Sequence, residues 1–166
     1  NNTANPEGYV VAVLGATGLV GQTMIAVLEE RNFPVRTLVP LAATSGGRTV
    51  RFRGTDIPVQ QVQPDSFNGV DIAIFSAGGA ASLTYAPEAA SRGCVSIISK
   101  RGGLVETNSH GLFLNYVTKE ELFNKLNKII NSPSLINFYR KKTLEQFKHS
   151  IFKTIKEVNI IYKELL

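Results

Sequence analysis

The sequence contains a single cysteine and no tryptophan, and its apolar runs stay well below the roughly 20 residues that a membrane-spanning helix needs. One cysteine excludes an internal disulfide and a cysteine-based metal site, so we expect no bound metal and a reducing, cytoplasmic location. The polar segment 1–8 lacks the basic and apolar regions of a signal peptide. With 166 residues and 43% hydrophobic composition, the chain fits one soluble globular domain that makes no membrane contact.

Lysine is absent from residues 1–99, and alanine is absent from residues 100–166. The first stretch has a net charge of −1, from six Arg and seven acidic residues, and the second has a net charge of +6, from ten Lys, two Arg and six acidic residues. Two interpretations stay open: a lysine-rich helical surface following an alanine-rich half, or a join near residue 99 between sequences of different origin. The abrupt change favours the join. Because acidic residues are mixed with the lysines on polar helix faces, we expect no nucleic-acid binding.

Apolar, β-branched runs alternate with helical patterns along the chain. Runs typical of buried strands of a parallel sheet occupy 9–14, 36–41, 70–76, 94–99 and 112–117. Segments 49–53 and 57–62 predict a hairpin, and 80–92 a helix. The alternation predicts a single α/β domain. We expect a doubly wound, mostly parallel Rossmann-like sheet of about five or six strands, with helices on both faces and a helical C-terminus.

Capping signals mark the predicted helices of the second half. Thr118, with Glu121 three residues later, is a capping-box pattern that opens a helix. Ser132 followed by Pro133 predicts the start of the next helix. The last predicted helix carries an apolar stripe that either packs onto the sheet or binds a coiled-coil partner, made up of Ile151, Ile155, Val158, Tyr162 and Leu165.

The strongest chemical signal is the string Gly15-Ala-Thr-Gly-Leu-Val-Gly21, placed between a predicted buried strand and a helix. Glycines at this position permit a tight turn and a close approach of the backbone to a pyrophosphate. The N–H groups that begin the following helix attract the anion. Two interpretations remain, a phosphate-binding loop and a glycine-rich turn that only packs the helix against the strand.

Residues 8–98 closely resemble the N-terminal cofactor domain of aspartate-semialdehyde dehydrogenase. Four strings occur in the family's order: VAVLGATGLVGQTM, VLEERNFPV, SFNGVDIAIFSAGG and YAPEAASRG. Family members are two-domain enzymes that use NADP to interconvert aspartyl phosphate and the semialdehyde, so the resemblance implies NADP as the cofactor. It also implies the cofactor-binding residues: the loop glycines Gly15 and Gly21; Thr17, Gly18, Leu19 and Val20 around the pyrophosphate; and Ser76, Ala77 and Gly78 in the cleft.

The sequence departs from the family after the second predicted strand. Residues 41–48 lack the family's Ser-x-Arg-Ser segment for the 2′-phosphate, and Ser45, with Arg48, is the candidate substitute. No Asp or Glu follows this strand to accept the ribose 2′-hydroxyl of NAD.

The family's catalytic residues lie in its second domain, so no residue of this chain is assigned a catalytic role, and we expect it not to be an enzyme. Cys94 is expected to be a small buried residue. His110 and His149 are expected at the surface.

Residues 95–166 resemble the C-terminal end of a family-4-type glycosyltransferase of GT-B architecture. The matching features are Gly102-Gly103-Leu-Val-Glu106, His110-Gly111 and the helix start at Ser132. That family holds its donor sugar nucleotide with a Glu-x7-Glu pair, and no such pair occurs over 80–92. Glu106 is then a remnant of a site, and glycosyl transfer is not expected.

These observations lead to the hypothesis of an engineered chimera without catalytic activity, which retains at most residual binding of NADP(H). Its parts are a flexible N-terminus at 1–8, a dehydrogenase-like cofactor half at 9–99 and a glycosyltransferase-like half at 100–166. Two alternatives stay open: a genuine dinucleotide-binding module that acts as a sensor or binding subunit, and a truncated oxidoreductase similar to aspartate-semialdehyde dehydrogenase. The expected partner is a second copy of the chain, through the helices of the second half or a sheet edge.

Overall fold

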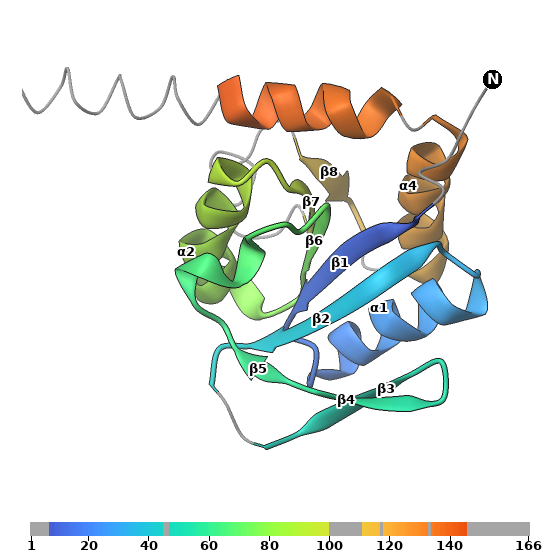
Figure 1. The fold of residues 1–166 in the computed structure, drawn as a ribbon, viewed down its shortest axis with the longest axis vertical. Coiled ribbons are helices and arrows are strands. Elements are labelled where there is room, and N and C mark those ends of the chain that lie inside the picture. Colours follow the sequence, from blue (N-terminus) through green and yellow to red (C-terminus); the bar gives the residue numbers. More distant parts are fainter. Residues whose placement is uncertain (1–6, 45–46, 100–110, 117, 133, 146–166) are drawn as a thin grey trace, which may run out of the picture.

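A parallel six-stranded sheet forms the centre of the molecule (Figure 1). The computed structural model describes residues 7–44, 47–99, 111–116, 118–132 and 134–145. Spatial order in the sheet is β5-β2-β1-β6-β7-β8, and every neighbouring pair is parallel. The strands are β1 Tyr9–Leu14, β2 Val35–Ala42, β5 Gln60–Gln61, β6 Ile72–Phe75, β7 Val95–Ser99 and β8 Leu112–Leu114. The predicted Rossmann-like α/β sheet is confirmed.

Helices cover both faces of this sheet, as the apolar runs of its strands require. On one face, Val11 and Ile74 pack in a cluster with residues of α1 (Leu19–Glu30) and α4 (Lys119–Asn131). On the other face, Leu14 and Phe75 pack in a second cluster with α2 (Gly78–Ser91) and the short 3-10 helix η1 (Pro64–Phe67). Figure 1 shows α2 separated by the sheet from α1 and α4.

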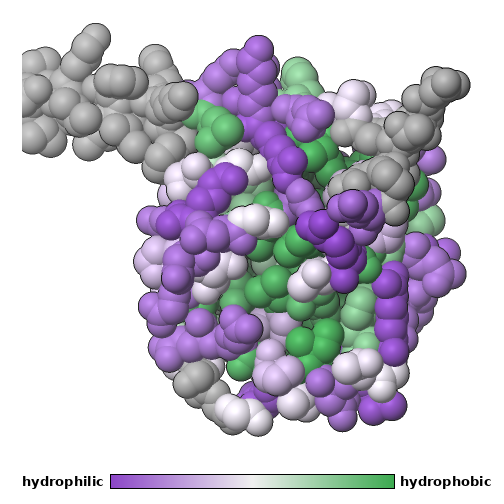
Figure 2. Space-filling view, in the orientation of Figure 1, coloured by the Kyte–Doolittle hydropathy of each residue, from purple (hydrophilic) through white to green (hydrophobic). Residues whose placement is uncertain are grey.

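Cover over β1 and β2 is less complete than over the rest of the sheet. Val10 in β1 and Val39 in β2 are only half-buried. Figure 2 shows apolar surface gathered at the centre of the same view, over the part of the sheet that β1 and β2 form, with polar side chains around it. Polar surface therefore surrounds, but does not cover, this part of the sheet.

The predicted hairpin is shorter than expected, and its second segment is divided. Strands β3 (Thr49–Phe52) and β4 (Thr55–Pro58) pair antiparallel outside the main sheet. The chain then leaves the hairpin, and Gln60 and Gln61 pair with Leu41 and Ala42 of β2. Assigning 57–62 to a single strand was wrong, because Gln60 and Gln61 bond to a different partner from Ile57.

Strand β2 contains a buried proline, Pro40, which lies opposite Val13 of β1. Leu41 accepts hydrogen bonds on the β1 side, and Ala42 accepts one from Val62 on the other side. Because successive residues of a parallel strand bond to alternate neighbours, the proline nitrogen faces away from β1. The missing N–H therefore costs no bond between β1 and β2.

The second half of the sequence continues the same sheet. Strand β8 pairs with β7, and α4 packs beside α1. The predicted strand over 112–117 ends early, at Leu114, because the Glu121 carboxylate accepts hydrogen bonds from the backbone N–H groups of Asn115 (2.8 Å) and Tyr116 (2.6 Å). Partial burial opposes a lowered pKa at Glu121, but these two donors, together with the positive charge of Lys125 and the Asn115 side-chain amide, hold the pKa below its ordinary value.

Thr118 caps α4 as predicted, since its hydroxyl accepts a hydrogen bond from the Glu121 backbone N–H at 3.2 Å. The reciprocal half of the capping box is replaced, because the Glu121 carboxylate binds the preceding turn instead. The described residues of the next helix, 134–145, lie across the amino end of the sheet. There Arg140 forms an ion pair with Asp71, and its Nε donates to the Gly93 carbonyl.

Among the described residues, no helix has both the length and the apolar character to cross a bilayer. The predicted loop with Glu106 and His110, the residue His149 and the apolar stripe from Ile151 to Leu165 lie outside these residues.

Candidate functional site

The glycine loop connects the end of β1 to the start of α1, and its first glycine is required by both conformation and packing. Gly15 has a φ of +90°, in the region that side chains disfavour. A Cβ at this position would lie 2.8 Å from the Ala77 nitrogen and 2.8 Å from the Ser76 hydroxyl oxygen. The backbone N–H groups of Gly15 and Ala16 both donate to the Leu41 carbonyl, at 2.8 and 3.0 Å. The loop is therefore anchored to both neighbouring strands, β2 and β6.

Gly21 allows helix α1 to lie directly against the loop. A Cβ at Gly21 would come within 2.1 Å of the Gly15 carbonyl oxygen and 2.9 Å of the Ala16 Cα. Both neighbours are backbone, so the helix could not keep this position with a side chain there. Gly15 and Gly21 are therefore required for packing the helix against the strand. Their packing also brings the start of the helix close to the end of the strand.

The middle of the loop has a different environment. Gly18 is exposed, and a Cβ on it would touch only the Gly15 carbonyl oxygen, at an ordinary 3.4 Å. Its own N–H donates to that oxygen at 3.0 Å, so this N–H is already used inside the loop. The Gln22 side chain donates to the Thr17 carbonyl at 3.1 Å. One side chain and one backbone N–H therefore hold these two loop carbonyls, and the exposed side of the turn at Gly18 carries no side chain.

The start of α1 is suited to an anion. Gly18 is the N-cap residue, and no side chain caps the helix. The first N–H groups of a helix have no partner within it and carry partial positive charge. Leu19 and Val20, the first two helical residues, are 83% and 40% exposed. This end of the helix is consequently open to a ligand.

The loop lies where the order of the strands reverses. From β1 the chain proceeds outward to β2 and then returns to β6 on the opposite side of β1. Open parallel sheets bind ligands in the crevice beyond the carboxyl ends of the strands at such a point. Ser76, Ala77 and Gly78 follow β6 directly, and the Ser76 hydroxyl donates to the Leu14 carbonyl at 2.9 Å. The fold thus brings the two predicted groups of residues, 15–21 and 76–78, to the same crevice.

Of the remaining predicted positions, Ser45 lies outside the described residues. Arg48 is exposed and immediately precedes β3. That the ten predicted residues contact a cofactor stays a prediction.

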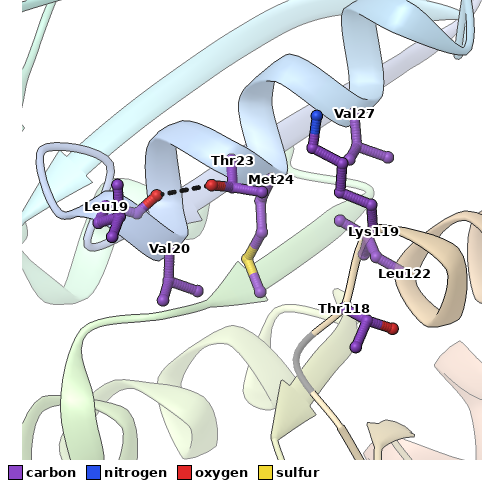
Figure 3. Close-up of a pocket in the computed structure, with 8 residues that line it drawn as sticks. All are labelled: Leu19, Val20, Thr23, Met24, Val27, Thr118, Lys119 and Leu122. Atoms are coloured by element: carbon purple, nitrogen blue, oxygen red, sulfur yellow. Dashed lines mark hydrogen bonds between the residues drawn. The ribbon is translucent and has the colours of Figure 1, made fainter.

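A hollow of about 140 Å³ opens beside the loop, between α1 and α4. Figure 3 shows Val20, Met24 and Leu122 around it, with the Thr23 hydroxyl donating to the Leu19 carbonyl. Its other polar side chains also have partners: Thr118 caps α4, and Lys119 pairs with Glu30 at 2.9 Å. The hollow is therefore an apolar extension of the exposed Leu19 and Val20 surface, without a free charge to orient a polar ligand.

Cys94 is fully buried, as predicted, and its sulfur lies 3.3 Å from the Val70 carbonyl oxygen, to which the thiol donates. Burial raises the pKa of this thiol to about 12, and the positive charge of Arg140 only partly opposes the shift. A thiol that stays protonated at neutral pH is a poor nucleophile, so Cys94 has a structural role. Within the described part of the chain, no three His, Cys, Asp or Glu side chains gather as a metal site.

Residues 10–102 match the family model described as semialdehyde dehydrogenase, NAD binding domain. This chain belongs to the semialdehyde dehydrogenase family. The aspartate-semialdehyde dehydrogenase of Bacillus subtilis is 40% identical over 143 residues, which are 86% of this chain and 41% of that protein. The enzyme of the same name from Legionella pneumophila is 54% identical over 86 residues, 51% of this chain and 25% of that protein.

A solved structure of this family resembles the chain as well. The chain is similar to the crystal structure of aspartate semialdehyde dehydrogenase II from Vibrio cholerae in complex with ASA, with a TM-score of 0.55 and 46% identity. That similarity covers 58% of this chain and 32% of the other. The chain spans between about a quarter and two fifths of the length of these relatives.

Two expectations change with these findings. The prediction that the chain is not an enzyme is wrong for its family, because the relatives that it matches are named as dehydrogenases. The chimera hypothesis and the glycosyltransferase resemblance receive no support. An alignment of 143 residues with one dehydrogenase must extend past the proposed join at residue 99. The truncated-dehydrogenase alternative fits the comparisons better.

Sequence reasoning missed Gln22 and Leu41, which bond to backbone groups of the loop. It placed Ser76 in the cleft but did not foresee that its hydroxyl bonds to the backbone at the start of the loop. The bond from Ser76 to Leu14 spans 62 positions, so only the sheet topology could have indicated it.

Proposed function

We propose that this chain is the dinucleotide-binding part of an aspartate-semialdehyde dehydrogenase and binds NADP(H) at the glycine loop. The observation that carries the proposal is the crevice at the strand-order reversal, where the uncapped start of α1 and the segment after β6 lie on either side. The exposed Gly18 leaves room for a pyrophosphate against the backbone, and Gly15 and Gly21 let the start of the helix approach the end of the strand.

The residues present fit such a cofactor. The N–H groups of Leu19 and Val20 would bind the pyrophosphate, together with that of Thr17, and Gly18 would allow close approach. In this family NADP(H) accepts or supplies a hydride. The role of this chain is to hold the cofactor and expose its reactive end to the remainder of the enzyme. Substrate chemistry belongs to the remaining length of the relatives, which this chain does not span.

Preference for NADP over NAD is supported by the segment after β2. Residues 41–48 contain no carboxylate that would bind the 2′-hydroxyl of NAD and repel a 2′-phosphate, and Arg48 provides an exposed cation. An Arg48→Ala variant should weaken NADPH binding about tenfold or more and leave NADH binding unchanged, because only NADPH carries the 2′-phosphate. Equal effects on both nucleotides would contradict the assignment of Arg48.

The site itself is tested by two variants of matched size, Gly18→Asp and Gly18→Asn. Both side chains are good N-caps, so both proteins should fold. Only Asp adds a negative charge at the start of α1, and it should weaken NADPH binding at least about tenfold relative to Asn. Binding is measured by quenching or enhancement of NADPH fluorescence. Asn137→Asp, on the exposed side of the helix over 134–145, controls for net charge.

We expect NADPH binding to be saturable, to be weaker in Gly18→Asp than in Gly18→Asn by at least about tenfold, and to be unchanged in Asn137→Asp. An unmodified chain that melts cooperatively and shows no NADPH binding at millimolar concentration would refute the proposed function.

A further inference from the structure

Ser76 makes two hydrogen bonds to one backbone atom at the end of the neighbouring strand. Its backbone N–H donates to the Leu14 carbonyl at 2.8 Å, as expected where β6 continues beside β1. Its hydroxyl donates to the same oxygen at 2.9 Å. Since a serine hydroxyl has one proton, that proton is engaged with Leu14, and the side chain has none to donate to a ligand in the crevice.

The Leu14 carbonyl belongs to the same planar peptide group as the Gly15 N–H. That N–H donates to the Leu41 carbonyl at 2.8 Å. The peptide group that begins the glycine loop is therefore held on one side by Ser76 of the β6 end and on the other by β2. Because the peptide is planar, fixing the oxygen also fixes the direction of the N–H.

The packing of Gly15 strengthens this arrangement. A Cβ on Gly15 would lie 2.8 Å from the Ser76 Oγ, so the hydroxyl occupies the space that the absent side chain leaves. Ser76 is half-buried at this position. The hydroxyl therefore supports the loop by contact as well as by its hydrogen bond.

We infer that Ser76 is a positioning residue, whose hydroxyl fixes the Leu14–Gly15 peptide and thereby orients the loop backbone for a pyrophosphate-bearing ligand. The inference rests on the proposed function of the loop. It differs from the expectation that Ser76 lines the cleft as a direct contact. A direct contact after β6 would affect only ligands that extend across the crevice, whereas a support for the loop affects every ligand that carries a pyrophosphate.

The test compares Ser76→Ala with Ser76→Thr, which keeps a hydroxyl, using NADPH and inorganic pyrophosphate as separate probes. Loss of one supporting hydrogen bond should weaken both probes by the same factor, about threefold to tenfold. The Thr variant should restore most of the affinity. Ser91→Ala is the matched control, because the Ser91 hydroxyl also donates to a backbone carbonyl, that of Glu88, at 2.8 Å. Both residues lie in α2, at the end away from the loop.

A second readout needs no ligand. Amide hydrogen exchange should become faster at Gly15 and Ala16 in Ser76→Ala and remain unchanged in Ser91→Ala. Weakening of NADPH alone, equal weakening by Ala and Thr, or unchanged exchange at Gly15 would each overturn the inference. If the unmodified chain binds neither probe, the proposed function fails, and the exchange measurement alone decides whether Ser76 holds the loop.

Discussion

Adding one methyl group at Gly21 should destabilise the fold, because the contact between α1 and the glycine loop has no room for it. The Cβ of a Gly21→Ala variant would lie 2.1 Å from the Gly15 carbonyl oxygen and 2.7 Å from the Gly15 carbonyl carbon. These atoms belong to the backbone at the end of β1, so relief requires the helix and the loop to separate. Overpacking of this kind costs about 1–3 kcal/mol, and sometimes more.

Helix propensity acts in the opposite direction, since alanine is favoured over glycine inside a helix by about 1 kcal/mol. The contact at 2.1 Å is far closer than real Cβ atoms make, so we take the steric cost at the upper end or beyond. The expected net loss in the free energy of unfolding is about 2 kcal/mol, or roughly 5 °C in Tm. Urea denaturation followed by circular dichroism measures it.

Two other glycines serve as matched controls for the same substitution. Gly18→Ala places its Cβ at an ordinary 3.4 Å from the Gly15 oxygen and should cost only about 0.5–1 kcal/mol, through the weaker N-cap. Gly79→Ala, in α2, meets nothing within 4 Å and should stabilise by about 0.4–1 kcal/mol. If Gly21→Ala loses no more stability than Gly18→Ala, the close packing of α1 on the loop is refuted.

Three further predictions concern stability. Because burial raises the pKa of Cys94 to about 12 from an ordinary 9.0, the unfolded chain loses this proton first as pH rises. Unfolding free energy should therefore fall by about 1 kcal/mol between pH 8 and pH 10, a loss that Cys94→Ala removes. Glu121 has a lowered pKa, so its contribution is complete above its ordinary pKa and is lost as pH falls through the folded value. Glu121→Gln should flatten the acid side of a stability profile, and an unchanged profile would contradict the role of its two backbone donors. Arg140→Met removes the ion pair with Asp71 and should cost about 1.5–3 kcal/mol by urea denaturation. A loss below 0.5 kcal/mol would show that helix 134–145 does not depend on this pair.

The sequence was sufficient to predict those elements whose structure depends only on residues within the same segment. The run from Tyr9 to Leu14 is apolar throughout, and all of it except the half-buried Val10 is buried, as its composition predicts. Thr118 lies at a helix start and caps it. Gln60 and Gln61 were predicted as strand, but within the hairpin, because only their pairing with β2 in the folded chain separates them from Ile57.

The site shows the same division between local and long-range information. The order of glycines predicted a turn between strand and helix. It did not distinguish Gly21, which packs, from Gly18, which is exposed, because that difference depends on the distance to Gly15 in the folded loop. The change in composition near residue 99 suggested a join, yet an alignment with one dehydrogenase covers 86% of the chain and β8 extends the sheet in parallel with β7. A change in composition therefore does not mark the end of this fold, because the strand pairing continues across it.

The outer edge of β2 has a consequence for solubility. Strand β5 covers this edge only at Leu41 and Ala42, which leaves the earlier part of β2 as a potential template for strands of other molecules. Arg53 blocks its beginning, since the guanidinium donates to the carbonyls of Phe33 (2.8 Å) and Val35 (2.9 Å). Farther along, the ring of Pro40 withholds a donor that an incoming strand would need. One cation and one imino acid thus protect this edge of the sheet against edge-to-edge aggregation while leaving the opposite bonds to β1 intact.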